Sequence, residues 1–227
     1  MNNPPAVVLL SGGLDSCVAA AAAAARGPVA LLHLNYRQRT ERRELRAFEA
    51  IADHFAAVAR LIIDVSYMKQ IGGSSLLESS VPLPADEGAE VPSTYVPFRN
   101  ANLLGIGVAW AEVLGAAEVY IGVHQEEAAY PDCSAAFVEA YNRMVRQGTR
   151  PKSRIEVAAP FVALDKAAIV RRGVELGAPL HLSWSCYQAD ERACGVCHSC
   201  RLRLEGFRRA GVKDPIPYAI TPEEERC

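Results

Sequence analysis

A short turn rich in glycine and serine near the N-terminus has the residue types needed to bind a nucleotide. Residues 11–16 read Ser-Gly-Gly-Leu-Asp-Ser and directly follow the apolar run Val7–Leu10. Backbone N–H groups at a helix start bind anions, and glycines let the backbone approach a phosphate closely. The turn lacks the lysine of a P-loop and the spacing of a dinucleotide fingerprint.

These features predict a site that holds pyrophosphate through backbone amides and hydroxyls, with Asp15 beside Mg²⁺. The alternative is a simple glycine turn followed by an Asp or Ser helix cap. The nucleotide-binding residues expected here are Leu10, Ser11, Gly12, Gly13, Leu14, Asp15 and Ser16.

Four cysteines near the C-terminus have the spacing of metal ligands. They are Cys186, Cys194, Cys197 and Cys200, in a chain with seven cysteines in all. Four thiolates at this spacing favour tetrahedral Zn²⁺ with no open coordination position, so a structural zinc is predicted. The alternatives are a site in which His181 or His198 replaces one cysteine, an iron–sulfur cluster, or a redox Cys-x-x-Cys pair.

Alternating strand and helix patterns surround these two groups of residues. Branched apolar runs predict strands at 7–10, 29–34, 61–65, 119–123 and 155–158, and helical spacing predicts helices at 15–25, 45–55, 100–114, 134–146 and 165–176. This alternation predicts an α/β fold with a mostly parallel, doubly wound sheet and helices on both faces. Ligands of such sheets bind at the carboxyl ends of the strands, where the 11–16 turn would lie.

Two parts of the chain differ from that pattern. Residues 66–97 contain adjacent glycines, repeated serines and several prolines, which predicts a long, mobile loop over the active site. Residues 1–180 are expected to form the nucleotide-binding domain, with a small zinc-binding region, residues 181–227, packed on it. The arginines after the cysteines are predicted to form a solvated helix face; they are Arg201, Arg203, Arg208 and Arg209.

Composition narrows the range of partners. The 227 residues carry a formal net charge of −2 and show no basic stripe, so nucleic acid is not expected as a partner. No apolar run is long enough to span a membrane, and the N-terminal residues lack the pattern of a secretion signal. A cytoplasmic protein without a membrane partner is therefore expected.

Several stretches together resemble the 7-cyano-7-deazaguanine synthase family, or QueC family, of the N-type ATP pyrophosphatases. They are residues 11–16, Asn-Tyr-Arg-Gln-Arg at 35–39, Thr-Tyr-Val-Pro-Phe-Arg-Asn at 94–100, Tyr-Pro-Asp-Cys at 130–133, and Ser-Trp-Ser-Cys-Tyr at 183–187 with the later cysteines. The resemblance implies an adenine nucleotide α-hydrolase-like fold and a homodimeric, C–N bond-forming ligase of queuosine biosynthesis. It also implies ATP, Mg²⁺ and Zn²⁺ as cofactors. The expected substrates are 7-carboxy-7-deazaguanine and ammonia, joined to give 7-cyano-7-deazaguanine (preQ0) through adenylated carboxylate and amide intermediates.

The resemblance further implies roles for individual residues. Asp15, Arg99 and Lys166 are expected to be catalytic, and the expected substrate-binding residues are Arg99, Asn100, Tyr130, Pro131, Asp132 and Cys133. The alternatives from local sequence are a surface helix start at Arg99, an exposed first-turn lysine at Lys166, and an ordinary turn at Pro131-Asp132. His33 and His124 are expected to be structural, with ligand contact as the alternative for His124.

The substrate side departs from the family pattern. Residues 126–129 read Glu-Glu-Ala-Ala and are one residue shorter than usual, Ser134 replaces a common arginine, and Phe98 replaces a small residue. An alternative function is therefore a related enzyme that adenylates a deazaguanine acid and joins it to a protein amine in antiviral defence. A tRNA-modifying enzyme and a zinc-ribbon binding module are the remaining alternatives.

Overall fold

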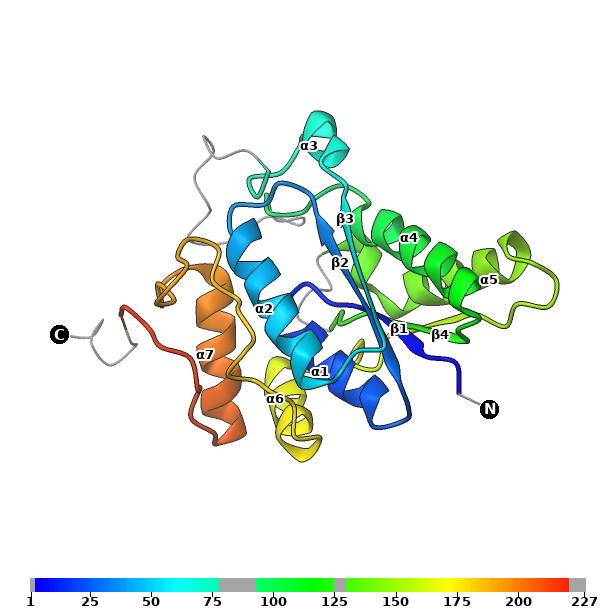
Figure 1. Ribbon diagram of the computed structural model, residues 1–227. Helices are drawn as coiled ribbons and strands as arrows, with labels where there is room; N and C mark the ends of the chain where they lie inside the picture. The colour runs from blue at the N-terminus through cyan, green and yellow to red at the C-terminus, as the bar shows by residue number, and fades with distance from the viewer. Residues whose placement is uncertain (1–2, 78–92, 125–129, 221–227) are drawn as a thin grey trace.

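A five-stranded sheet forms the centre of the computed structural model, which describes residues 3–77, 93–124 and 130–220 (Figure 1). Its strands are β1 (Ala6–Leu9), β2 (Val29–Asn35), β3 (Ala59–Asp64), β4 (Glu118–Tyr120) and β5 (Glu156–Ala158). They follow the order β3-β2-β1-β4-β5, and every neighbouring pair is parallel. The predicted parallel, doubly wound sheet is therefore confirmed.

Helices cover both faces of this sheet because β1 buries its side chains on both sides. Val7 and Leu9 pack with Leu104 of α4 (Arg99–Leu114), in a cluster that also includes α5 (Ala135–Gly148). Val8 and Leu10 belong to a second cluster, formed with α1 (Leu14–Ala24), α2 (Glu41–His54) and α6 (Lys166–Glu175). Successive residues of a strand point to opposite faces, so the continuous apolar run gives two cores rather than one.

The order of the strands places a crevice at the carboxyl ends of β1 and β4. From β1 the chain continues to β2 on one side, whereas from β4 it continues to β5 on the other side. The loops that follow these two strands therefore diverge, which is the usual ligand position in open parallel sheets. Ser11, Gly13 and residues 121–124 border this crevice.

Most predicted elements are present, with ends shifted by a few residues. The largest shifts are at α2, which begins at Glu41, four residues before the predicted start, and at β4, which ends at Tyr120, three residues before the predicted end. Within residues 66–97 the structure contains a short helix that was not predicted, α3 (Tyr67–Ile71), in which Met68 is buried. One buried residue in a single turn is too little to give a helical pattern. Residues 78–92 of the predicted loop lie outside the described residues. Residues 126–129, where the sequence departs from the family pattern, also lie outside them.

The C-terminal region has little regular structure apart from α7 (His198–Ala210), which packs against α6 (Figure 1). Arg201, Arg208 and Arg209 are exposed as predicted, whereas the prediction for Arg203 is wrong, because this side chain is 1% exposed. Its guanidinium donates two hydrogen bonds to the Asp214 carboxylate, at 2.8 and 3.0 Å. Arg203 and Asp214 are 11 positions apart in the chain, which is farther than the three or four positions that separate charge pairs within a helix.

No helix in the described residues is both long and apolar enough to cross a bilayer.

Candidate functional site

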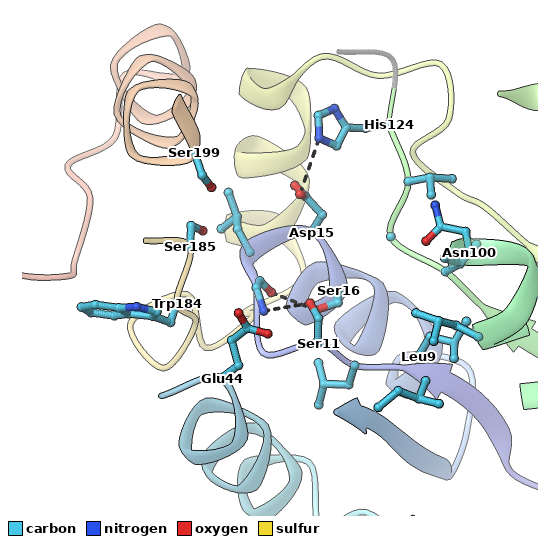
Figure 2. Close-up of a pocket in the computed structure, with 18 of the residues that line it drawn as sticks. Leu9, Ser11, Asp15, Ser16, Glu44, Asn100, His124, Trp184, Ser185 and Ser199 are labelled. Atoms are coloured by element: carbon cyan, nitrogen blue, oxygen red, sulfur yellow. Dashed lines mark hydrogen bonds and ion pairs between the residues drawn. The ribbon is translucent and has the colours of Figure 1, made fainter. Parts of the chain in front are cut away.

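The turn between β1 and α1 lines a cavity of about 220 Å³ at the carboxyl edge of the sheet (Figure 2). Ser11 and Ser16 place their hydroxyl oxygens 3.0 Å apart, and the Gly13 amide donates to the Ser11 hydroxyl over 3.2 Å. Gly13 is the N-cap of α1 and makes no side-chain capping bond. The helix-cap alternative is therefore wrong, and the first amides of α1 are available to bind an anion.

Two glycines give this turn its shape. Gly12 has a φ of +90°, and a Cβ there would lie 2.6 Å from the carbonyl oxygen of Glu44 in α2. Gly122, after β4, packs so closely that a Cβ would lie 2.8 Å from the backbone nitrogen of Ser16. Of the seven residues predicted to bind the nucleotide, Gly12 is the one that does not line the cavity. In this structure it holds the turn against α2.

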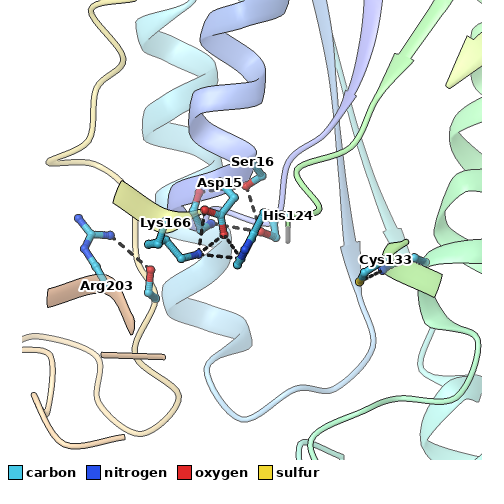
Figure 3. A network of polar contacts seen from close by, with 10 residues as sticks. Asp15, Ser16, His124, Cys133, Lys166 and Arg203 are labelled. Carbon is cyan, nitrogen blue, oxygen red and sulfur yellow. Dashed lines mark hydrogen bonds and ion pairs between the residues drawn. The ribbon is translucent and has the colours of Figure 1, made fainter. Parts of the chain in front are cut away.

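Asp15 is paired with Lys166 inside the cavity (Figure 3). Lys166 Nζ lies 2.9 and 2.8 Å from the two carboxylate oxygens of Asp15 and 2.9 Å from His124 Nε2. Burial opposes the ionisation of Asp15, but the attraction of Lys166 and His124 and the hydrogen bonds from Lys166 together outweigh it, so the pKa of Asp15 lies below its usual value. The Asp15 carboxylate is therefore ionised at neutral pH, as a magnesium ligand must be.

The position of Lys166 overturns its predicted alternative as an exposed lysine. Lys166 is the first residue of α6, whose N-cap Asp165 accepts a hydrogen bond from the Ala168 amide, and its side chain is 9% exposed. Gly206 of α7 lies directly opposite, where a Cβ would overlap the Lys166 side chain. Sequence reasoning missed Gly206, although a glycine in a helix interior costs about 1 kcal/mol and often has a packing reason.

The two histidines have different surroundings. His33 is fully buried and bonds to the Leu10 carbonyl oxygen at 3.0 Å and to Asn35 Oδ1 at 2.9 Å. This position agrees with the structural role predicted for His33. His124 lines the cavity beside Lys166, which favours the alternative prediction that it contacts ligand.

The C-terminal region builds one wall of the same cavity, a contribution that sequence reasoning missed. Figure 2 shows Trp184, Ser185 and Ser199 on the side of the turn opposite Asn100. The Trp184 amide donates to the Gly12 carbonyl oxygen over 2.8 Å. Arg203 also lines the cavity and donates to the Ser183 hydroxyl over 2.9 Å. The C-terminal region is therefore directly bonded to the turn.

The start of α4 brings Arg99 and Asn100 to the cavity. Arg99 donates to the Tyr36 hydroxyl over 3.2 Å, and its guanidinium carbon lies 5.6 Å from the Tyr36 ring centroid. The Asp132 carboxylate accepts a 2.7 Å hydrogen bond from the backbone N–H of Asn100, and the Asp132 residue is 3% exposed. Burial raises the pKa of the Asp132 carboxyl. This carboxylate therefore holds the start of α4, a role that the sequence did not suggest.

A smaller second cavity lies beside the first, and its lining includes Arg99, Tyr130 and Asp132. The Tyr130 hydroxyl lies 2.6 Å from Thr94 Oγ1, and the Tyr130 ring stacks on Tyr95 with centroids 5.9 Å apart. Pro131 is exposed and Cys133 is buried, and neither lines a cavity described here. The predicted substrate-binding residues are therefore close in space but do not all face the same cavity.

The four cysteines form one cluster, with all Sγ atoms within 4.8 Å of one another. Ligands about 2.3 Å from a tetrahedral zinc lie roughly 3.8 Å apart, and the Sγ atoms of Cys194 and Cys200 lie 3.9 Å apart. The amides of Gln188 and Cys194 each approach the Cys186 sulfur to 3.4 Å, which stabilises a thiolate. The cluster is compatible with zinc, and no histidine of the described residues belongs to it.

Comparisons with known proteins agree with these observations. The family described as "Queuosine biosynthesis protein QueC" matches residues 5–211. A 7-cyano-7-deazaguanine synthase from Chlorobaculum tepidum is 49% identical over 221 residues, which is 96% of this chain and 97% of that protein. The synthase from Chlorobium phaeobacteroides is 50% identical over 222 residues, which is 96% of this chain and 98% of that protein.

Among solved structures, the NMN synthetase from Francisella tularensis has a TM-score of 0.51 and 17% sequence identity, over 98% of this chain and 81% of that one. At this level of identity the likeness shows the fold alone. It agrees with the α/β architecture of a parallel sheet covered by helices.

Proposed function

The chain belongs to the QueC family, and from this premise we propose that it converts 7-carboxy-7-deazaguanine and ammonia to 7-cyano-7-deazaguanine at the expense of ATP. The observation that carries the proposal is the cavity at the carboxyl edge of the sheet. There the α1 N-terminus, the Asp15–Lys166 pair and Arg99 face one another. An anion-binding helix start, a carboxylate and two cations are the groups needed to bind and activate ATP.

The chemistry requires two activations. A carboxylate is a poor electrophile, so its oxygen first attacks the α-phosphorus of ATP, which releases pyrophosphate and forms an acyl adenylate. Ammonia then adds to the carbonyl carbon, and loss of AMP and a proton gives the amide. The amide oxygen then attacks the α-phosphorus of a second ATP and releases a second pyrophosphate. Loss of AMP and of both N–H protons from this adenylated amide leaves the nitrile. No covalent enzyme nucleophile is needed, and the protein contributes positioning and charge.

The residues of the nucleotide cavity suit the first half of each activation. The α1 amides and the hydroxyls of Ser11 and Ser16 would bind the departing pyrophosphate. Lys166 would neutralise charge on the phosphates, since its ammonium already faces the cavity. Asp15 would hold Mg²⁺, which supplies charge neutralisation when it is bound. The cysteine cluster would hold zinc in a structural role, because its four thiolates leave no position for a reacting group.

Arg99 suits the contact between the nucleotide and the acid. Arg99 lines both cavities, so its side chain lies near the place where a substrate carboxylate would meet the α-phosphate. A planar guanidinium binds carboxylate and phosphate oxygens in a bidentate manner. The assignment of Asn100, Tyr130, Pro131, Asp132 and Cys133 to the substrate, and of the homodimer, stays a prediction from the family.

The proposal is tested with purified protein, 7-carboxy-7-deazaguanine, MgATP and ammonium, with products followed by mass spectrometry. We expect nitrile, with two AMP and two pyrophosphate released for each nitrile formed. In a reaction without ammonium, neither amide nor nitrile should appear. No AMP in response to the acid would contradict the proposal. An amide that never becomes nitrile would restrict the enzyme to the first activation.

A further inference from the structure

Two cavities meet at the carboxyl edge of the sheet. Among the described residues, Arg99 and Tyr187 are the two that line both of them. Arg99 comes from the first residue of α4, whereas Tyr187 directly follows Cys186 in the C-terminal region. One side of the boundary between the cavities is therefore formed by the start of α4. The other side is formed by residues 183–200, which carry the four clustered cysteines and are called the cysteine loop below.

The proposed reaction requires the two substrates to meet at this boundary. The acid oxygen attacks the α-phosphorus, so the acid and the nucleotide must touch where the two cavities join. Arg99 supplies positive charge there. The second cavity is lined by Thr94, Tyr95, Tyr130 and Asp132, a set of aromatic rings and polar atoms that suits a flat heterocycle with N–H donors.

The second cavity alone is too small for a bicyclic heterocycle. Its volume is about 30 Å³, less than a single ring system requires, so a bound heterocycle must extend to the boundary. Of the two residues that line both cavities, Tyr187 is the one with an aromatic ring. A tyrosine ring is a large, flat, apolar surface on which a heterocycle can stack.

The surroundings of Tyr187 hold it in place. Its ring packs against an apolar cluster of Leu76, Leu77 and Val96, which also contacts Tyr36. The residue before it in the chain, Cys186, belongs to the cysteine cluster. The position of the ring is therefore fixed by the apolar cluster on one side and by the cysteine loop on the other.

We propose that Tyr187 is a substrate-positioning residue: its ring stacks on the deazaguanine so that the carboxylate points to Arg99 and the nucleotide. The inference rests on the proposed function and adds a role for the C-terminal region in recognition of the acid. The cysteine cluster then has a purpose beyond stability, because it holds the backbone that presents this ring.

The test uses Tyr187→Leu and Tyr187→Phe in the full-length protein. Leucine keeps the apolar packing against Leu76 and Val96 but removes the ring, whereas phenylalanine keeps the ring. The control is Tyr67→Ala, because Tyr67 lies on α3, is 44% exposed and lines neither cavity. Zinc content and melting temperature of each variant are measured first, and acid-dependent AMP formation then gives KM for the acid and for ATP.

We expect Tyr187→Leu to raise KM for the acid roughly 10-fold (about 1.4 kcal/mol), with KM for ATP within about twofold of the wild type. Tyr187→Phe and Tyr67→Ala should keep both KM values within about twofold. A purely structural role would not separate the two substrates in this way.

The contrary outcomes are distinct. An unchanged KM for the acid in Tyr187→Leu, or an equal rise in KM for ATP, would overturn the inference and leave the proposed function standing. Wild-type protein that forms no AMP in response to the acid would overturn the proposed function, and the inference with it.

Discussion

The β1–α1 turn and the cysteine loop line the same cavity, but different forces hold them. The turn follows a strand in which Val7 and Val8 are fully buried, and it leads into a helix packed on the sheet. The cysteine loop belongs to a small cluster in which Cys186, Cys197 and Cys200 are themselves part of the buried set. Hydrophobic burial therefore fixes the first region, whereas metal ligation is expected to fix the second.

Because different forces hold them, the two walls of the site can be disturbed separately. Three contacts nevertheless join the C-terminal region to the rest of the site: the Trp184 amide on the Gly12 carbonyl, the Arg203 guanidinium on the Leu180 carbonyl, and Gly206 against Lys166. Variants on either side of these contacts, and at the contacts themselves, test how independent the walls are.

The largest effect is expected at the turn. Asp15→Asn should lower AMP formation by at least about 100-fold, because it removes the carboxylate that pairs with Lys166 and would hold Mg²⁺. Zinc content, measured by metal analysis, should be unchanged, since the cysteine loop does not contact Asp15. Persistent AMP formation in this variant would remove Asp15 from the mechanism.

A control is needed because Asp15→Asn leaves the buried Lys166 cation without its carboxylate. Breaking a buried ion pair costs about 3–5 kcal/mol, so the variant is expected to melt at a lower temperature. The double variant Asp15→Asn with Lys166→Met should recover stability but not activity. Recovery of both would show that the single variant had only unfolded the site.

A substitution in the cysteine loop should change the zinc content of the protein, which Asp15→Asn should leave unchanged. Cys197→Ser should lower zinc content well below that of the wild type and reduce solubility, because three thiolates hold zinc less firmly than four. Limited proteolysis followed by mass spectrometry should show cleavage within residues 184–218 while the sheet stays intact. A metal-free variant that resists proteolysis as the wild type does would contradict the structural-zinc prediction.

Arg203 tests how the C-terminal region is held against the rest of the site, since its guanidinium also donates to the Leu180 carbonyl oxygen over 3.2 Å. Arg203→Met should destabilise the protein by about 3–5 kcal/mol in denaturant unfolding, because the Asp214 carboxylate, 5% exposed, then loses its cation. The double variant Arg203→Met with Asp214→Asn should recover part of this loss. Equal stability of the wild type and Arg203→Met would show that the buried pair is not formed.

Gly206→Ala should give a smaller and more selective effect. A methyl group there overlaps the Lys166 side chain, so the ammonium should shift and the rate of AMP formation should fall about 10-fold. Gly105→Ala is the matched control, since a Cβ at this helical glycine meets only ordinary contact, 3.6 Å from the Tyr141 hydroxyl. Equal activity of both variants would mean that α7 does not position Lys166.

The smallest effect concerns thiol reactivity in the two regions. Burial raises the pKa of the Cys17 thiol on α1 to about 12, so Cys17 stays protonated at pH 8 and should resist alkylation. The clustered cysteines should resist alkylation only until a chelator removes their metal. Mass spectrometry of iodoacetamide-treated protein, with and without chelator, distinguishes them. Fast labelling of Cys17 in the folded protein would contradict its burial.

The sequence predicted the elements that local patterns encode. The buried run at β1, the Ser-Gly-Gly-Leu-Asp-Ser turn and the alanine-rich α1 are contiguous in the chain, so their arrangement follows from strand and helix periodicity. The cysteine spacing was equally local, and the structure brings the four sulfurs together.

The contacts that complete the site could not be predicted from the sequence, because they join residues that are far apart in the chain. Lys166 meets Asp15 across 151 positions and His124 across 42, and neither separation leaves a periodic signal. Gly206 and Arg203 depend on how α7 packs against α6, which helix patterns alone do not specify. The short α3 was missed because it has a single buried residue, Met68.

We expect the β1–α1 turn to bind the phosphates of ATP. A crystal structure with a non-hydrolysable ATP analogue and Mg²⁺ would show where they lie. We expect the β- and γ-phosphates to lie against the amides of residues 13–16, with Lys166 Nζ within hydrogen-bond distance of a phosphate oxygen. Phosphates bound elsewhere on the protein, with the turn unchanged and empty, would contradict the account.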